Sequence, residues 1–191
     1  MGVPVHLLQS MTVEDFLGFT ESRPDEERWE LIDGEPILNA SPSYLHQKIV
    51  GNLIIALSAV ERRKRATTWS AIPGIGVRLS ERSAPVPDVL VRPKDYLAGR
   101  TCDDMIAAFE VLSPKTSDRD LHWKRQAYAS LPSLAHYVVI AQDAIEVATY
   151  ARHRDFREQR LGSLGARLDL DALDASIKLS EIYQDTGLQV G

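Results

Sequence analysis

Two carboxylates and one ammonium stand at positions of this sequence where an apolar side chain would be expected. Asp88 lies in the run VPDVLV and Glu110 in AAFEVL, and both runs are typical of short buried strands. Lys124 lies in DLHWKRQAY, which has helical spacing. Burying a charge without a partner is costly, so such residues usually bind a metal or pair with one another. The three residues therefore predict a site for a metal and a phosphate.

Side chains alternate between the two faces of a strand, which shows the face on which each carboxylate lies. Glu110 shares a strand face with Ala108 and Leu112, and Asp88 shares one with Leu90. If the two strands are neighbours, both carboxylates can reach one hard cation at the same edge of the sheet. Mg²⁺ suits this arrangement, because it accepts one or two carboxylates and fills its other positions with water and phosphate oxygens.

Lys124 lies on the stripe of its expected helix that faces the sheet, between Leu121 and Tyr128. The helix, from about residue 117 to 130, directly follows the strand that carries Glu110, which returns the ammonium over the end of that strand. Three polar residues between the strand and Lys124 are expected to cap the helix: Ser113, Thr116 and Asp120.

Each of these residues also has a purely structural explanation. Asp88 could cap a turn after Pro87, and Glu110 could form a salt bridge just outside the sheet. The stem of Lys124 could pack on apolar surface with its ammonium in water. A structural role is the better explanation for either acid taken alone, but the occurrence of both acids favours a metal-binding site.

The elements before the first acid begin with a capped helix over about residues 12–22. The segment WELIDGEPIL then predicts a hairpin turning at Asp33-Gly34, with Glu30 on its first strand. A long helix over about residues 43–64 follows. One apolar stripe defines it: Ile49, Val50, Leu53, Leu57 and Val60. His46 falls on this stripe and is expected to point inward, either as a core or capping residue or as part of the site.

The later elements indicate the fold class. AAFEVL, DLHWKRQAY and LAHYVVIA read as strand, helix and strand, a crossover that implies two parallel strands. TTWSAI and GVRLS predict a bent hairpin or two consecutive strands, EVATYA and DFREQRLG an exposed hairpin, and IKLSEIYQD a short helix. We expect an α/β (α+β) fold with a central mixed β-sheet flanked by helices and an added hairpin.

Composition fits one domain over residues 1–191, with an N-terminal helix and loop (1–28), a core (about 29–150) and a C-terminal extension (151–191). The net charge of −5 argues against a large sequence-independent DNA footprint. Basic clusters at residues 62–65, 119–125 and 152–157 could form a local footprint, but we favour their explanation as solvated helix ends or loops. With one cysteine and no apolar run long enough to span a bilayer, we expect a cytoplasmic protein without a membrane partner.

Several stretches together resemble the PD-(D/E)XK nuclease superfamily, and within it the Uma-type family of restriction endonuclease-like proteins. They run from about Trp29 to Tyr150: WELIDGEPI, the SP turn and following helix with His46, VPDVLV, FEVLSPKTSDRD, Lys124 with Tyr128, and HYVVI. One departure from the superfamily pattern stands at Leu112, which occupies the lysine position of the EXK motif. In the family that the chain resembles, the lysine has moved to the following helix, where Lys124 stands.

The resemblance implies a restriction endonuclease-like fold and a role for each matching residue. Asp88, Glu110 and the backbone carbonyl of Val111 would bind Mg²⁺, with Mn²⁺ as a substitute, and Lys124 would activate water or stabilise charge. Glu30 would complete the metal shell or pair with Lys124. His46 and Tyr128 would support the site.

The expected function is a metal-dependent DNA endonuclease that hydrolyses phosphodiester bonds. The alternative is a catalytically inactive module of the same fold that binds DNA or another protein, since no DNA-reading motif is recognisable. An unrelated hydrolase of small substrates is a third possibility. We also expect a homodimer, by analogy with restriction nucleases and because Trp123 is expected to project from the helix face opposite Lys124.

Overall fold

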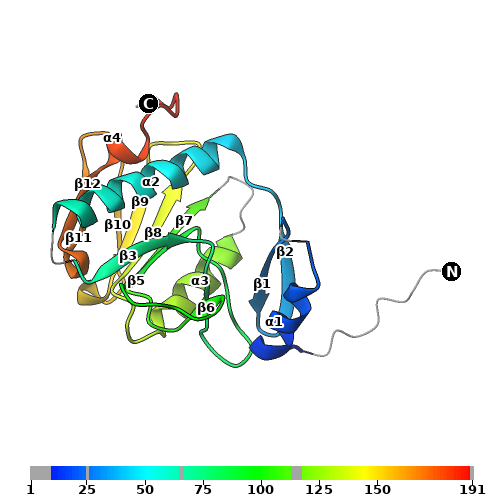
Figure 1. Cartoon of the computed structure of the whole chain (residues 1–191). Helices are drawn as coiled ribbons and strands as arrows, with labels where there is room; N and C mark the ends of the chain where they lie inside the picture. The colour runs from blue at the N-terminus through cyan, green and yellow to red at the C-terminus, as the bar shows by residue number, and fades with distance from the viewer. Residues whose placement is uncertain (1–9, 25, 65–66, 113–117, 190–191) are drawn as a thin grey trace.

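A six-stranded mixed sheet forms the centre of the computed structural model, which describes residues 10–24, 26–64, 67–112 and 118–189 (Figure 1). The strand order is β10-β9-β8-β7-β5-β3. The bounds are β3 Trp69–Pro73, β5 Val89–Pro93, β7 Ala107–Leu112, β8 His136–Ala141, β9 Val147–Ala151 and β10 Glu158–Leu161. Only β7 and β8 pair in parallel within this sheet, and the other pairs are antiparallel. The predicted mixed sheet is confirmed.

Two helices cover opposite faces of the sheet (Figure 1). Helix α2 (Tyr44–Arg63) begins at the N-cap Ser43 and buries the predicted apolar stripe, including Leu53 and Leu57, against one face. Helix α3 (Asp118–Ala129) connects β7 to β8 and packs Tyr128 against the other face. The predicted crossover is therefore present, and it places α3 over the face that carries Glu110.

The N-terminal elements stand beside the sheet (Figure 1). Helix α1 (Val13–Glu21) has the predicted cap, in which the Thr12 hydroxyl accepts from the backbone N–H of Asp15. Strands β1 (Arg28–Ile32) and β2 (Glu35–Asn39) form the predicted hairpin. Its two turn residues, Asp33 and Gly34, have positive φ values of 50° and 85°, as a two-residue turn of the primed type requires.

Smaller elements complete the fold. Strands β4 (Gly76–Val77) and β6 (Thr101–Cys102) form a parallel pair, so the expected second strand around GVRLS is only two residues long and does not pair with β3. Strands β11 (Arg167–Leu170) and β12 (Ala175–Lys178) pair, and α4 (Leu179–Ile182) follows. In the segment IKLSEIYQD, Ile177 and Lys178 therefore end β12, and the predicted short helix begins at Leu179.

One sequence-based expectation was wrong about exposure. Strand β9 was expected in an exposed hairpin, but all five of its residues are buried because it is an inner strand of the central sheet. In the predicted C-terminal extension after residue 151, apolar side chains, among them Leu168, Ile177 and Ile182, belong to the core cluster under α2.

No helix among the described residues is both long enough and apolar enough to cross a membrane.

Candidate active site

Asp88 directly precedes β5 and is held by two hydrogen bonds. Its Oδ2 accepts from the backbone N–H of Val111 at 2.7 Å, and its Oδ1 lies 3.0 Å from the Nε2 of His46. Asp88 was expected inside the strand, but β5 begins one residue later, at Val89, and the side chain of Asp88 retains 17% of its exposure. The last backbone pair between β5 and β7 is Val89 with Phe109. Beyond this pair, the Asp88 carboxylate takes the place of a β5 carbonyl as the acceptor for the backbone N–H of Val111.

The same edge of β7 presents a carbonyl oxygen. In a strand, the backbone groups of successive residues point to opposite edges. The Leu112 carbonyl accepts from Gln142 next to β8, so the carbonyl of Val111 faces the β5 edge, where Asp88 lies. Asp88 and the Val111 carbonyl are therefore on the same side of β7.

Glu110 is buried on the α3 face of β7, with 5% of the residue exposed. Its Oε1 accepts from Lys124 Nζ at 3.1 Å and from the Tyr128 hydroxyl at 3.0 Å. The pKa of Glu110 is raised to about 7, mainly by burial; the Lys124 charge opposes this rise, and the Asp88 and Glu30 charges add to it. A cation bound next to Glu110 would lower this pKa and stabilise the ionised carboxylate.

Lys124 connects the acids of two separate elements. Its Nζ lies 3.1 Å from Glu110 Oε1 and 3.4 Å from Glu30 Oε2, and its side chain is 15% exposed. Burial alone would lower the pKa of Lys124, but the charges of Glu110 and Glu30 outweigh burial and raise that pKa. The expected turn of the ammonium toward a buried acid is found, and the alternative of an ammonium extended into water is not.

Glu30 brings the hairpin into the site. It is 5% exposed, and besides its ion pair with Lys124 it accepts from the backbone N–H of Val86 at 3.4 Å. The expected pairing of Glu30 with Lys124 is therefore found. The hairpin is tied to the rest of the molecule near this point, because Leu31 and Ala84 exchange backbone hydrogen bonds.

His46 and Tyr128 hold the two acids from opposite layers. His46 comes from the first turns of α2, where the N-cap Ser43 accepts from its backbone N–H. Its ring is 14% exposed and faces Asp88, as the apolar stripe predicted. Tyr128, on α3, is fully buried against the sheet, and burial together with the nearby Glu110 charge raises the pKa of its hydroxyl well above the usual value. The hydroxyl therefore stays protonated and donates to Glu110.

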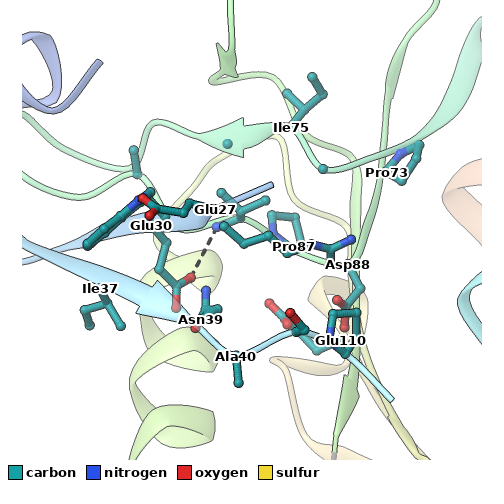
Figure 2. A pocket seen from close by; sticks show the side chains of 18 of the residues that line it. Glu27, Glu30, Ile37, Asn39, Ala40, Pro73, Ile75, Pro87, Asp88 and Glu110 are labelled. Atoms are coloured by element: carbon teal, nitrogen blue, oxygen red, sulfur yellow. Dashed lines mark hydrogen bonds between the residues drawn. The ribbon is translucent and has the colours of Figure 1, made fainter. Parts of the chain in front are cut away.

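A cleft of about 1210 Å³ gives access to these groups. Asp88, Glu110, Lys124, Glu30 and His46 all line it. Figure 2 shows Asp88 and Glu110 next to each other, with Glu30 on the hairpin side of the pocket. The cleft lies between the hairpin and the edge of the central sheet, and these three acids come from three different segments: β1, the residue before β5, and β7.

The oxygen donors fit a magnesium-type ion. Within the described ranges, no group of three or more His, Cys, Asp and Glu side chains is placed to hold a metal ion. Mg²⁺ does not need three, because it binds through one or two carboxylates and keeps several waters. Asp88, Glu110 and the carbonyl of Val111 would provide such a partial shell.

The remaining predicted residues are either not described by the structure or make other contacts. Ser113 and Thr116 lie outside the described residues, and Asp120 lies in α3 with a side chain outside that description. Trp123 does not project freely from α3, because it is half-buried and its Nε1 donates to Asp33 Oδ2 at 3.1 Å. The indole holds the hairpin turn, so Trp123 does not support the predicted homodimer.

The sequence did not point to several cleft residues on the hairpin, among them Arg28, Ile37 and Asn39. In an antiparallel pair, residues directly opposite each other project from the same face. The register pairs Glu30 with Ile37 and Arg28 with Asn39, so all four side chains share the face of Glu30. The two-residue turn at Asp33-Gly34 fixes this register, and it could have been read from the sequence.

Comparison with known proteins agrees with this architecture. One similar solved structure is a protein from Anabaena variabilis, described as "a putative nuclease belonging to DUF820". Its TM-score is 0.72 at 15% sequence identity, and the match covers 91% of this chain and 97% of that one. At this identity the likeness shows a shared fold. No curated protein matches the sequence.

The family comparison covers most of the chain. Residues 13–180 match the model of the Uma2 family, which is described as "Putative restriction endonuclease". The matched range contains every residue of the site described above. The chain therefore belongs to the Uma2 family.

Proposed function

We propose that this protein is a metal-dependent DNA endonuclease that hydrolyses phosphodiester bonds. The observation that carries the proposal is the convergence of Asp88, Glu110 and Lys124 in one cleft. Strands β5 and β7 and helix α3 bring them together from three parts of the chain. The membership in a family described as restriction endonucleases supports the same conclusion.

Each residue has a role that follows from its contacts. Asp88, Glu110 and the carbonyl of Val111 would bind Mg²⁺, or Mn²⁺ in its place. When bound, such an ion polarises the phosphate and lowers the pKa of a water molecule, which makes attack on phosphorus possible near neutral pH. Lys124, held by two acids at the inner end of the cleft, orients the attacking water or stabilises the negative charge that develops on phosphate oxygens.

The supporting residues fix the geometry of this centre. His46 holds the carboxylate of Asp88 from α2, and Tyr128 holds Glu110 from α3. Glu30 shares Lys124 with Glu110, which keeps the ammonium between two carboxylates. These contacts leave the metal-binding oxygens little freedom before substrate arrives, and such preorganisation favours catalysis.

DNA is the proposed partner, and a homodimer that cuts both strands and a cytoplasmic location remain predictions. The family description supports a nucleic-acid substrate.

A cleavage assay tests the proposal. Purified protein is incubated with labelled DNA, as duplex and as single strand, in Mg²⁺, in Mn²⁺ and in EDTA. We expect cleavage only with a divalent ion, and a loss of at least about a hundredfold in rate for Glu110→Gln and Asp88→Asn, because each removes a charged ligand. Glu21→Gln serves as the matched control, since Glu21 is exposed at the end of α1 and does not line the cleft.

Calorimetry separates this function from an inactive module of the same fold. Binding of Mn²⁺ to the wild type and its loss in Asp88→Asn would support the nuclease. DNA left uncut in every condition, together with no divalent binding at Asp88 and Glu110, would contradict it and favour the inactive module.

A further inference from the structure

One face of the hairpin forms a fixed wall of the cleft. Arg28 and Glu30 on β1 and Ile37 and Asn39 on β2 share this face, and Glu30 contacts Lys124 from it. The face is therefore turned toward the catalytic groups. Figure 2 shows Ile37 and Asn39 on this side of the pocket together with Glu30.

The wall is anchored along its length. Its turn is fixed because Trp123 Nε1 donates to Asp33, whose backbone N–H donates to Ser83 Oγ at 3.0 Å. Its middle is fixed by the backbone bonds of Leu31 with Ala84. A wall held at these points cannot swing away to admit a wide substrate without breaking these hydrogen bonds.

Ile37 is an exposed apolar residue that lines the same cleft as the acids. It retains 37% of its exposure while it lines the cleft directly opposite Glu30 in the hairpin register. From the sheet side, Ile75 and Pro87 also line the cleft (Figure 2). An apolar side chain at this place gains free energy only if the substrate covers it, and a nucleobase presents a suitable apolar face.

Among the residues that the structure describes, the charges of the cleft do not form a phosphate-binding groove for a duplex. This part of the lining contains four cations, Arg23, Arg28, Arg100 and Lys124, and Lys124 is already paired. Four acids balance them: Glu27, Glu30, Asp88 and Glu110. Recognition of a duplex backbone requires many unbalanced cations, whereas one strand can be held by a few cations and by contacts to its bases.

We propose that the cleft admits a single unpaired DNA strand and that Ile37 packs against a base next to the scissile phosphate. Arg28 and Asn39, beside Ile37 on the same face, contact the neighbouring phosphate or base edge. Paired DNA enters only where a nucleotide is unpaired, at a bulge, flap or frayed end. This inference rests on the proposed function, because it places the scissile phosphate at Asp88 and Glu110.

Binding without cleavage tests the inference. Fluorescence anisotropy in Ca²⁺ and in EDTA compares a labelled 16-nucleotide strand, its blunt duplex, and the same duplex with one bulged nucleotide. We expect the strand and the bulged duplex to bind at least about tenfold more tightly than the blunt duplex. Ile37→Ser should weaken binding of the strand about fivefold, because it removes one apolar contact to a base.

Leu38→Ser provides the matched control. Leu38 neighbours Ile37 on β2 and is 50% exposed, but it pairs with Trp29 on the opposite face of the hairpin. Its substitution should leave binding of the strand unchanged, and thermal melting checks that both variants are folded. Equal affinity for strand and blunt duplex, or equal effects of Ile37→Ser and Leu38→Ser, would overturn the inference.

An abasic scan along the strand sharpens the result. At one position, removal of the base should make the wild type and Ile37→Ser bind equally, whereas an Ile37 effect that persists at every abasic position would contradict the base contact. A preference for unpaired strands without cleavage in Mg²⁺ or Mn²⁺ would support the inference and contradict the proposed nuclease. Cleavage of blunt duplex alone would support the nuclease and contradict the inference.

Discussion

The two faces of the central sheet are built from the same strands but have different contents. Toward α2, β7 presents Phe109 and Val111, which belong to a continuous apolar core. Toward α3, the same strand presents Ala108 and Glu110. One strand of six residues thus supplies packing on one side and chemistry on the other.

This difference places the chemistry on one face of the sheet. Both faces bury apolar side chains, and such burial is the main favourable contribution to folding. The α3 face also buries the charges of Glu30, Glu110 and Lys124, and a buried ion pair seldom stabilises more than apolar residues of similar volume would. A protein selected for stability alone would have no use for these charges, so the α3 face is the one shaped by function.

Lys124→Met should produce the largest loss of stability on the α3 face. It leaves Glu30 and Glu110 buried without their counter-ion, and breaking a buried pair from one side costs about 3–5 kcal/mol. Urea unfolding monitored by circular dichroism measures the loss. Combining it with Glu30→Gln and Glu110→Gln should recover much of the stability, because no buried charge then remains; a triple variant weaker than Lys124→Met would contradict this explanation.

Leu53→Ala should be nearly as destabilising on the α2 face, by about 3 kcal/mol, because it opens a cavity in the apolar core. Leu53 is fully buried, whereas Ile55 on the same helix is 69% exposed, so Ile55→Ala should change the unfolding free energy by less than about 0.5 kcal/mol. Metal affinity of folded Leu53→Ala should match the wild type. A selective loss of metal affinity in this variant would break the distinction between the faces.

Tyr128→Phe should cost less, about 1–2 kcal/mol, because it removes one hydrogen bond to a charged group and keeps the packing of the ring. Chemical denaturation gives the value, with Tyr96→Phe as the exposed control, since Tyr96 is 91% exposed. An equal response of the two variants would show that the Tyr128 hydroxyl does not support Glu110.

The smallest effect should come from pH at the edge of the α2 face. His136 shares a face of β8 with Val138 and Ile140. Burial lowers the pKa of its imidazole. The Asp171 charge opposes this shift, and the charges of His153 and Arg154 add to it. A histidine with a lowered pKa in the folded state contributes stability that is present above the unfolded pKa of about 6.5 and is lost as the pH falls.

The wild type should therefore lose more unfolding free energy than His136→Gln between pH 7 and pH 5. The glutamine oxygen can accept from the Ala172 N–H as the His136 Nε2 does. Parallel stability profiles for the two proteins over this range would contradict the assignment.

Most of the fold could be predicted from the sequence because its signals are local. The cap at Thr12, the turn at Asp33-Gly34 and the stripe on α2 each specify their element with residues close in sequence. The burial of β9 could not be predicted, because it depends on β10 joining the sheet beside it. Neither strand encodes that neighbour locally.

The site divides in the same way. Asp88, Glu110 and Lys124 could be found because a charged residue within an apolar pattern can be recognised from the sequence alone. The contact of Trp123 with Asp33 could not, since it joins α3 to a turn 90 residues earlier in the chain. The role of Ile37 was missed because an apolar residue on a strand gives no signal until the opposite residue, Glu30, is known to face a cleft.

A crystal structure of the protein soaked in Mn²⁺ tests the central claim most directly. We expect an anomalous peak between Asp88 and Glu110, within about 2.0–2.4 Å of an oxygen from each carboxylate, with the carbonyl of Val111 completing the protein ligands. Soaked Glu110→Gln crystals should lose the peak. Crystals without density at this position, or with a stronger manganese site elsewhere on the chain, would contradict the assignment of the α3-side cleft as the catalytic centre.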